Sequence, residues 1–81
     1  MKITINIKDG SIFELNPIKI NEILVDRKFL TIHYKKEKIK FEKNMLDSYS
    51  IKPPFATTEG AKLMYIFANN LITILTNILS E

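Results

Sequence analysis

Residues 63–80 read LMYIFANNLITILTNILS, eighteen consecutive positions without a charged side chain in a chain of 81 residues. All twelve Lys and Arg residues and all nine Asp and Glu residues lie outside this stretch. At the helical turn angle of about 100° per residue, its polar residues gather in one arc roughly 120° wide, which only Ile66 interrupts. The pattern predicts a long amphipathic helix over residues 57–80, with an apolar arc roughly 200° wide.

The apolar arc is wider than one packing surface requires, since a helix that lies on a single core needs a stripe of about 100°. Three explanations are open: a strongly curved sheet wraps the helix, a partner docks on it, or the segment enters a membrane. Asn69, Asn70 and Asn77 oppose membrane insertion, because amides are costly in lipid and these three share one stripe. We therefore favour a partner, most simply a symmetric homodimer. The predicted self-association residues all lie on the apolar arc: Leu63, Phe67, Leu71, Ile74, Leu75 and Ile78.

Before the helix, the chain shows the period-two alternation of β-strands. The first alternating run, residues 3–7, ends at the turn signal Asp9-Gly10. A three-residue loop with Gly10 in the left-handed conformation would set Ile5 opposite Phe13 and keep one face of the hairpin apolar. A bulge is expected in the third strand, because its apolar parity slips near Asn21-Glu22. The remaining expected strands are residues 12–15, 18–25, 29–35 and 38–43, the last two joined by a tight turn at Lys36-Glu37.

These patterns predict an α+β fold: a small antiparallel β-meander of about five strands, followed by one long C-terminal helix packed on the sheet. We expect a single domain over residues 1–81, with the meander in residues 1–43 and the helix in residues 57–80. Residues 44–56 lose the alternation and are expected to form an irregular connection. So short a chain buries only about 60 to 65% of its unfolded surface, which makes oligomerisation a natural way to stabilise it.

The composition excludes several classes of site. The chain has no Cys and only two Gly residues, which leaves no thiolate-held metal and no glycine-rich phosphate loop. His33 is the single histidine, no serine lies in a recognisable nucleophile motif, and the acidic residues are scattered. We expect no catalytic, cofactor-binding or metal-binding residue, and therefore not an enzyme.

Two features bear on origin and location. Ile, Lys and Asn supply 32 of the 81 residues, a bias that AT-rich coding favours, so we predict a phage or mobile-element protein. Residues 1–10 contain no apolar run typical of a signal peptide. We therefore expect a cytoplasmic protein.

The net charge is +3, and the positive residues concentrate in one predicted hairpin between residues 27 and 43. Aromatic side chains interleave with them, which is typical of proteins that bind single-stranded nucleic acid. Lysines on a sheet also provide solubility and prevent edge pairing, and this second interpretation is the one we favour. The candidate nucleic-acid-binding residues are Arg27, Lys28, Lys35, Lys36, Lys38, Lys40 and Lys43.

The leading hypothesis is a small non-catalytic regulator or inhibitor that binds a protein target and self-associates through its C-terminal helix. The alternative is a nucleic-acid-binding protein that uses the basic hairpin. The two differ in a simple observation, because each phosphate that a protein neutralises steepens the salt dependence of binding by about one unit of slope.

Overall fold

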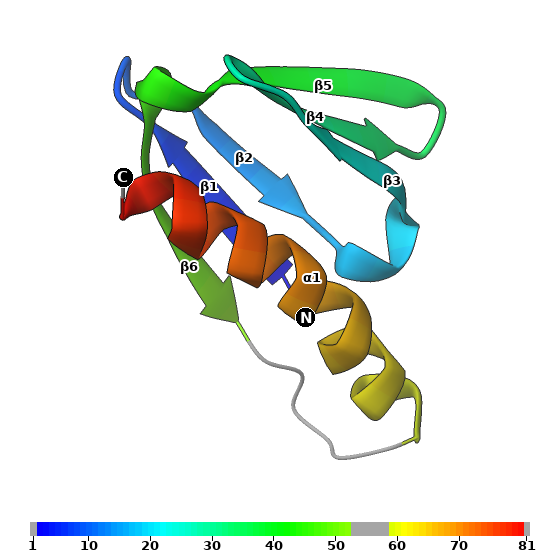
Figure 1. Cartoon of the computed structure of the whole chain (residues 1–81). Coiled ribbons are helices and arrows are strands. Elements are labelled where there is room, and N and C mark those ends of the chain that lie inside the picture. The colour runs from blue at the N-terminus through cyan, green and yellow to red at the C-terminus, as the bar shows by residue number, and fades with distance from the viewer. Residues whose placement is uncertain (1, 53–58, 81) are drawn as a thin grey trace.

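The structure, a computed structural model, describes residues 2–52 and 59–80, with helix side chains described at residue 66 and residues 68–80. Within these residues, strands come first and one long helix follows (Figure 1). The elements in chain order are β1 (Lys2–Ile7), β2 (Ile12–Leu15), η1 (Pro17–Lys19), β3 (Ile20–Val25), β4 (Phe29–Tyr34), β5 (Glu37–Glu42), η2 (Lys43–Met45), β6 (Leu46–Lys52) and α1 (Glu59–Leu79), where η marks a 3₁₀ turn. The predicted α+β class is confirmed.

The strands form two antiparallel three-stranded sheets, in the orders β2-β1-β6 and β3-β4-β5. The expected single meander of about five strands is wrong, because β6 pairs with β1 along residues assigned to the irregular connection 44–56. In β6 only Leu46 is buried and Tyr49 half-buried. The pairing with β1 also shifts register between Asn6 and Ile7. A strand with so few covered residues and a register shift shows no regular alternation in the sequence.

The first hairpin has the predicted register. Ile5 lies opposite Phe13, and the loop between β1 and β2 is closed by the N–H of Gly10, which donates to the carbonyl of Ile7 at 3.0 Å. Gly10 has a φ of +96°, a conformation that glycine adopts without the steric cost of a Cβ. The three-residue loop and the position of its glycine are therefore confirmed.

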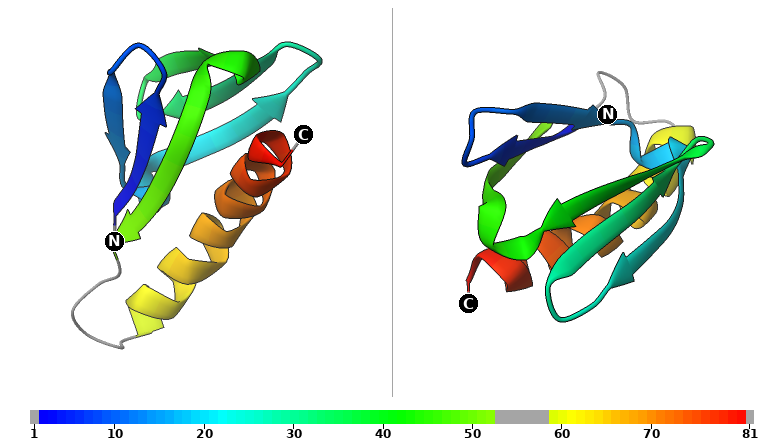
Figure 2. Two further views of the ribbon diagram at one scale, coloured as in Figure 1. Left: turned by 90° about the vertical axis from the view of Figure 1, so that its left-hand side faces the viewer. Right: turned by 90° about the horizontal axis from the view of Figure 1, so that it is seen from above.

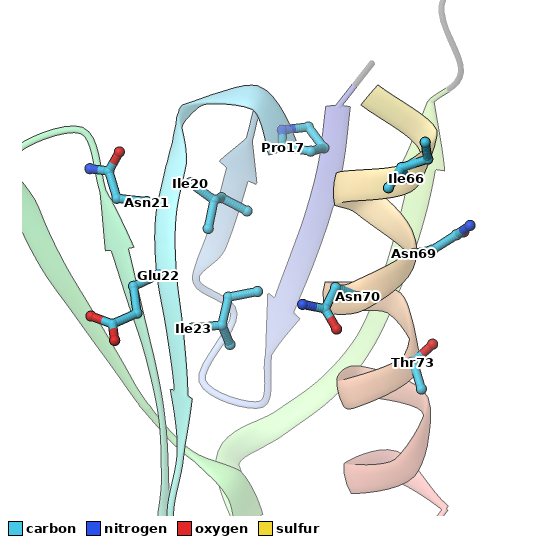
Figure 3. A pocket seen from close by; sticks show the side chains of 9 residues that line it. All are labelled: Pro17, Ile20, Asn21, Glu22, Ile23, Ile66, Asn69, Asn70 and Thr73. Carbon is cyan, nitrogen blue, oxygen red and sulfur yellow. The ribbon is translucent and has the colours of Figure 1, made fainter. Parts of the chain in front are cut away.

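The second sheet begins later than expected, because residues 17–19 form the 3₁₀ turn η1 in place of the start of a strand. Asn16 caps this turn, its side-chain oxygen accepting the N–H of Ile18 at 3.2 Å. The register of β3 against β4 shifts between Ile20 and Glu22, which confirms the predicted bulge. The bulge places Ile20 and Ile23 on the same side of β3 (Figure 3).

The turn between β4 and β5 lies one residue earlier than predicted, at Lys35-Lys36, since Tyr34 pairs with Glu37. Lys35 has a φ of +57°, a left-handed conformation that favours glycine. Tyr34 ties the two sheets together, because its hydroxyl oxygen accepts the backbone N–H of Asn16 at 3.0 Å.

One apolar core lies between the two sheets and α1, which packs against β6 and η1 (Figure 2). The rings of Phe13 and Phe41 meet edge to face across this core, with centroids 5.0 Å apart. The buried core residues are Ile3, Ile5, Leu15 and Leu46 from the first sheet, Leu30, Ile32 and Phe41 from the second, and Ala68, Leu71, Leu75 and Ile78 from α1.

The wide apolar arc of α1 is covered by the chain itself along the described part of the helix. Ile72, Ile74 and Leu79, at the borders of the buried stripe, are half-buried against the core. The hydroxyls of Tyr49 on β6 and Thr76 on α1 are 2.7 Å apart and hydrogen-bonded, which fixes the helix beside that strand. Two sheets thus cover more of the helix circumference than one sheet would. Among the described residues, no helix combines the length and hydropathy of a membrane span.

Candidate protein-binding groove

A groove lies between the edge strand β3 and the helix α1, and we call it the β3–α1 groove (Figure 3). Its volume is about 670 Å³, within the range of about 300 to 1,000 Å³ that ligand sites occupy. Ile20 and Ile23 point from β3 toward the helix, and Asn70 points back toward β3. The lining residues are Pro17, Ile20, Asn21, Glu22 and Ile23 from η1 and β3, and Ile66, Asn69, Asn70 and Thr73 from α1.

The floor and rim of the groove differ in polarity. Ile20 and Ile23 are half-buried and pack against the core, so they form an apolar floor. On the helix side, Asn69, Asn70 and Thr73 are exposed and uncharged. Glu22 is the one ionisable residue among the described lining residues. An apolar centre with a polar rim is the usual arrangement of a protein-binding surface.

The strand that borders the groove has a free backbone edge. In the described chain β3 pairs with β4 alone, and the N–H of Asp26 donates to the carbonyl of Phe29 at 3.0 Å. Antiparallel ladders alternate between bonded and non-bonded pairs, so the backbone groups of Leu24 face β4. Those of Ile23 and Val25 therefore face away from the sheet.

Large apolar side chains are exposed around this edge. Ile66 on the groove rim is 65% exposed, Leu24 and Val25 on β3 are 48% and 47% exposed, and Ile18 on η1 is 55% exposed. In the first sheet, Ile12 on β2 is exposed, and Ile51 on β6 is exposed to a lesser extent. Of these exposed residues, Ile66 lines the β3–α1 groove, and the others lie outside its lining.

Among the predicted self-association residues, those with described side chains do not form a surface that a second copy could reach. Leu71, Leu75 and Ile78 are buried in the core between the two sheets, with exposed fractions of 0, 1 and 9%. Ile74 is half-buried against the same core, and the side chains of Leu63 and Phe67 lie outside the described residues. A second copy cannot contact the three buried side chains while α1 stays on its own sheets. Self-association through the remaining residues of α1 stays a prediction.

The cations of the basic hairpin lie at both of its ends and along β5 between them. Arg27, Lys28 and Lys43 lie at the β3–β4 turn end, where the N–H of Lys43 donates to the carbonyl of Lys28 at 2.8 Å. Lys35 and Lys36 form the opposite turn. The intervening strand β4 has six residues, a separation of roughly 17 Å. The other two predicted residues, Lys38 and Lys40, are exposed along β5.

The aromatic residues of this hairpin do not form an open stacking surface. Phe41 is 4% exposed within the core, and Tyr34 packs against the same core. Phe29 is half-buried, with the Lys40 ammonium 4.1 Å from its ring centroid. A cation above the ring occupies the face on which a nucleobase would stack. The structure thus does not bring the predicted cations and aromatics together as one nucleic-acid interface.

His33 lies on the outer face of the second sheet, where its Nδ1 is 3.8 Å from the carboxylate of Glu22. Its side chain is 25% exposed, and no hydroxyl or thiol in the described residues is hydrogen-bonded to it. Among the described residues, no three potential metal ligands come together. This geometry offers His33 a carboxylate neighbour, without the nucleophile that a catalytic triad requires.

Two turn aspartates have lowered pKa values. The backbone N–H of Phe29 donates to the Asp26 carboxylate at 2.8 Å and that of Lys28 at 2.9 Å, and these bonds hold the Asp26 pKa below its usual value. The N–H of Ser11 similarly donates to Asp9 and lowers its pKa. Both groups are exposed and fix turns, and neither lines the β3–α1 groove.

Comparison of the chain with protein-family models, curated proteins and solved structures finds no match. The functional argument therefore rests on the chemistry of the surface itself.

The sequence contained two signals of the groove, although neither was interpreted as a site. Ile66 is the one apolar residue in the polar arc of the helix, and it lies on the groove rim. The parity slip in β3 is the bulge that directs Ile20 and Ile23 to the same side. Each is an exception to a local pattern. Their juxtaposition follows from the tertiary fold, which periodicity alone does not provide.

Proposed function

We propose that this chain is a small non-catalytic regulator or inhibitor that binds another protein at the β3–α1 groove. The observation that carries the proposal is Ile66, a large aliphatic side chain that is 65% exposed on the rim of a groove with an apolar floor. An exposed isoleucine costs little by itself. It lies across the groove from Ile20 and Ile23, so a partner seated in the groove would remove apolar surface on both walls from water.

The chain offers a matched test of this proposal, because Ile12 on β2 is 64% exposed and lies outside the lining of the groove. The Ile66→Lys and Ile12→Lys variants place the same charge at positions of equal exposure. Tagged wild-type protein and both variants are incubated with lysate of the source organism, and the retained proteins are quantified by mass spectrometry. We expect Ile66→Lys to lose at least about 90% of a retained partner, a tenfold weakening.

Ile12→Lys should retain the partner as the wild type does. Equal retention by both variants would place the binding surface elsewhere and overturn the proposal. Light scattering on the same samples measures self-association separately. A dimer that becomes a monomer in Ile66→Lys would identify a second copy as the occupant of the groove.

Nucleic-acid binding by residues 27–43 stays a prediction, and Phe29, Tyr34 and Phe41 offer it no open stacking surface. Mobility-shift measurements with short DNA and RNA at two salt concentrations test it. A shift at low salt that disappears when Lys36, Lys38 and Lys40 are changed to Glu would restore this alternative. The cytoplasmic location and the phage or mobile-element origin also stay predictions.

A further inference from the structure

We infer that the β3–α1 groove binds an extended segment of the partner protein, which pairs with β3 as a fourth strand of the β3-β4-β5 sheet. The inference rests on the proposed function and specifies the conformation and chemistry of the ligand. An extended peptide that joins a sheet edge gains affinity from backbone hydrogen bonds and specificity from alternate side chains.

The outer edge of β3 carries free backbone groups. The backbone N–H and C=O groups of Ile23 and Val25 face away from β4, as the register and the Asp26 to Phe29 hydrogen bond require. Strand β3 contains neither lysine nor proline, the residues with which proteins commonly block an edge. Its outward groups are thus free to pair with another strand along the length that follows the bulge.

The opposite wall of the groove is uncharged. Asn70 points toward β3, whereas Asn69, which also lines the groove with Thr73, points away from β3. Their amides and hydroxyl both donate and accept hydrogen bonds, as the backbone of an extended peptide does. A wall of carboxylates or ammonium groups would instead select an ionic ligand. The amide of Asn70 is therefore placed to pair with the outer backbone edge of a strand whose inner edge pairs with β3.

The side chains around the groove indicate which residues a ligand should carry. Ile20, Ile23 and Ile66 line the groove, so a bound strand should direct aliphatic side chains into it at alternate positions. Arg27 and Lys28 are exposed in the turn that follows β3. We infer that the ligand carries an acidic residue at the end that lies beside this turn. The groove thus favours a segment with alternating aliphatic residues and one acidic end.

A second copy of the chain is a poorer occupant. Symmetric antiparallel pairing of two β3 strands about Leu24 would align the outward groups of Ile23 with those of Val25. The same register would set Glu22 of each copy opposite Asp26 of the other, on one face of the sheet. Like charges directly opposite each other destabilise a strand pair. A segment from a different protein avoids this repulsion.

The experiment uses the full-length chain and a display library of random linear dodecapeptides. We expect the enriched peptides to share aliphatic residues two positions apart, followed or preceded by Asp or Glu at one end. Synthetic peptides of the enriched sequence are then N-methylated one residue at a time, and their affinities are measured by fluorescence anisotropy. Methylation at residues whose N–H faces β3 should weaken binding by about tenfold or more, whereas methylation at the alternating residues should change it less than about twofold.

The protein variants separate this inference from the proposed function. Val25→Pro removes an outward N–H and should weaken the peptide at least about fivefold, Ile66→Lys should weaken it further, and Ile12→Lys should have no effect. If Ile66→Lys weakens binding but the position of N-methylation makes no difference, strand pairing with β3 is overturned. The proposed function, binding of a protein at the groove, would then still stand. If Ile66→Lys does not weaken binding, both the proposed function and the strand pairing are overturned. The inference of an extended ligand is overturned if the library yields no enriched peptides. It is also overturned if the enriched peptides carry aliphatic residues three and four positions apart, the period of a helix.

Discussion

The two outer strands of the β3-β4-β5 sheet have equal length, but the residues along their outer edges are charged on β5 and aliphatic on β3. Both contain six residues and pair with β4 on one side, within the described chain. In β5 the backbone groups that face outward belong to Lys38, Lys40 and Glu42, as the pairing of Lys43 with Lys28 requires. In β3 they belong to the aliphatic Ile23 and Val25. One edge is thus protected by charge, and the other is open to pairing.

This difference shows why the distribution of charge is a poor indicator of the binding surface proposed here. Of the seven basic residues that stand out in the sequence, Lys38 and Lys40 lie on β5, the strand that should remain unpaired, and the others lie at the two ends of the hairpin. The strand without lysine borders the β3–α1 groove. For this chain, the absence of a protective residue on one edge is more informative than the abundance of charge on the other.

The largest expected effect concerns the core that holds both edges in place. Leu71 is fully buried between the two sheets, whereas Ile66, one and a half turns earlier on α1, is 65% exposed. Leu71→Ala should lower the free energy of unfolding by about 2 to 5 kcal/mol, because it removes packed methyl groups and leaves a cavity. Ile66→Ala should change it by less than about 0.5 kcal/mol. Urea unfolding followed by circular dichroism measures both, and equal effects would contradict the placement of α1.

The next effect tests which backbone groups face outward on β3. Leu24→Pro would remove an N–H that bonds to β4, and we expect a loss of about 2 to 4 kcal/mol in the free energy of unfolding. Val25→Pro would remove an outward N–H and should cost less than about 1 kcal/mol. Lys40→Pro is the matched variant on β5 and should also be tolerated. Thermal melts rank the three variants, and a reversed order for the two β3 variants would show that the edge assignment is wrong.

Parts of this fold could be predicted because they depend on local patterns. The alternation around Ile3 and Ile5 identified the first hairpin and its register, since the side chains that alternate are those that are buried. The parity slip identified the bulge in β3. The 3.6-residue period placed Leu71 and Leu75 on the buried side of α1.

The rest depends on contacts between distant residues. Strand β6 buries little and is stabilised by pairing with β1, a partner at the other end of the chain. The division of the strands into two sheets around one core was not predicted, and the homodimer stays a prediction. The β3–α1 groove combines a strand and a helix that are separated in sequence by three other strands. A periodic pattern within one segment cannot predict that these two distant elements lie side by side.

A smaller effect distinguishes the turn that leads into the protected edge. Lys35 has a φ of +57°, which costs a residue with a Cβ about 1 kcal/mol relative to glycine. Lys35→Gly should therefore raise the free energy of unfolding by up to about 1 kcal/mol, and Lys35→Ala should not. Lys36→Gly, in the same turn, should lower it slightly through added freedom of the unfolded chain. If Lys36→Gly stabilises the protein and Lys35→Gly does not, the turn geometry described here is wrong.

The smallest effect concerns the turn that follows the open edge, and it depends on pH. The Asp26 carboxylate accepts the N–H groups of Phe29 and Lys28, which lowers its pKa below the ordinary value of 3.8. A carboxylate with a lowered pKa stabilises the fold fully above the unfolded value, and this contribution is lost as the pH falls below 3.8 through the folded pKa. Asp26→Asn keeps an acceptor oxygen without the titrating group, so its urea midpoint should fall less than that of the wild type between pH 5 and pH 2. Asp9, whose pKa is also lowered, still contributes to the acid loss in both proteins. Parallel acid profiles for the two proteins would show that the hydrogen bonds from Phe29 and Lys28 to the Asp26 carboxylate are not formed as described.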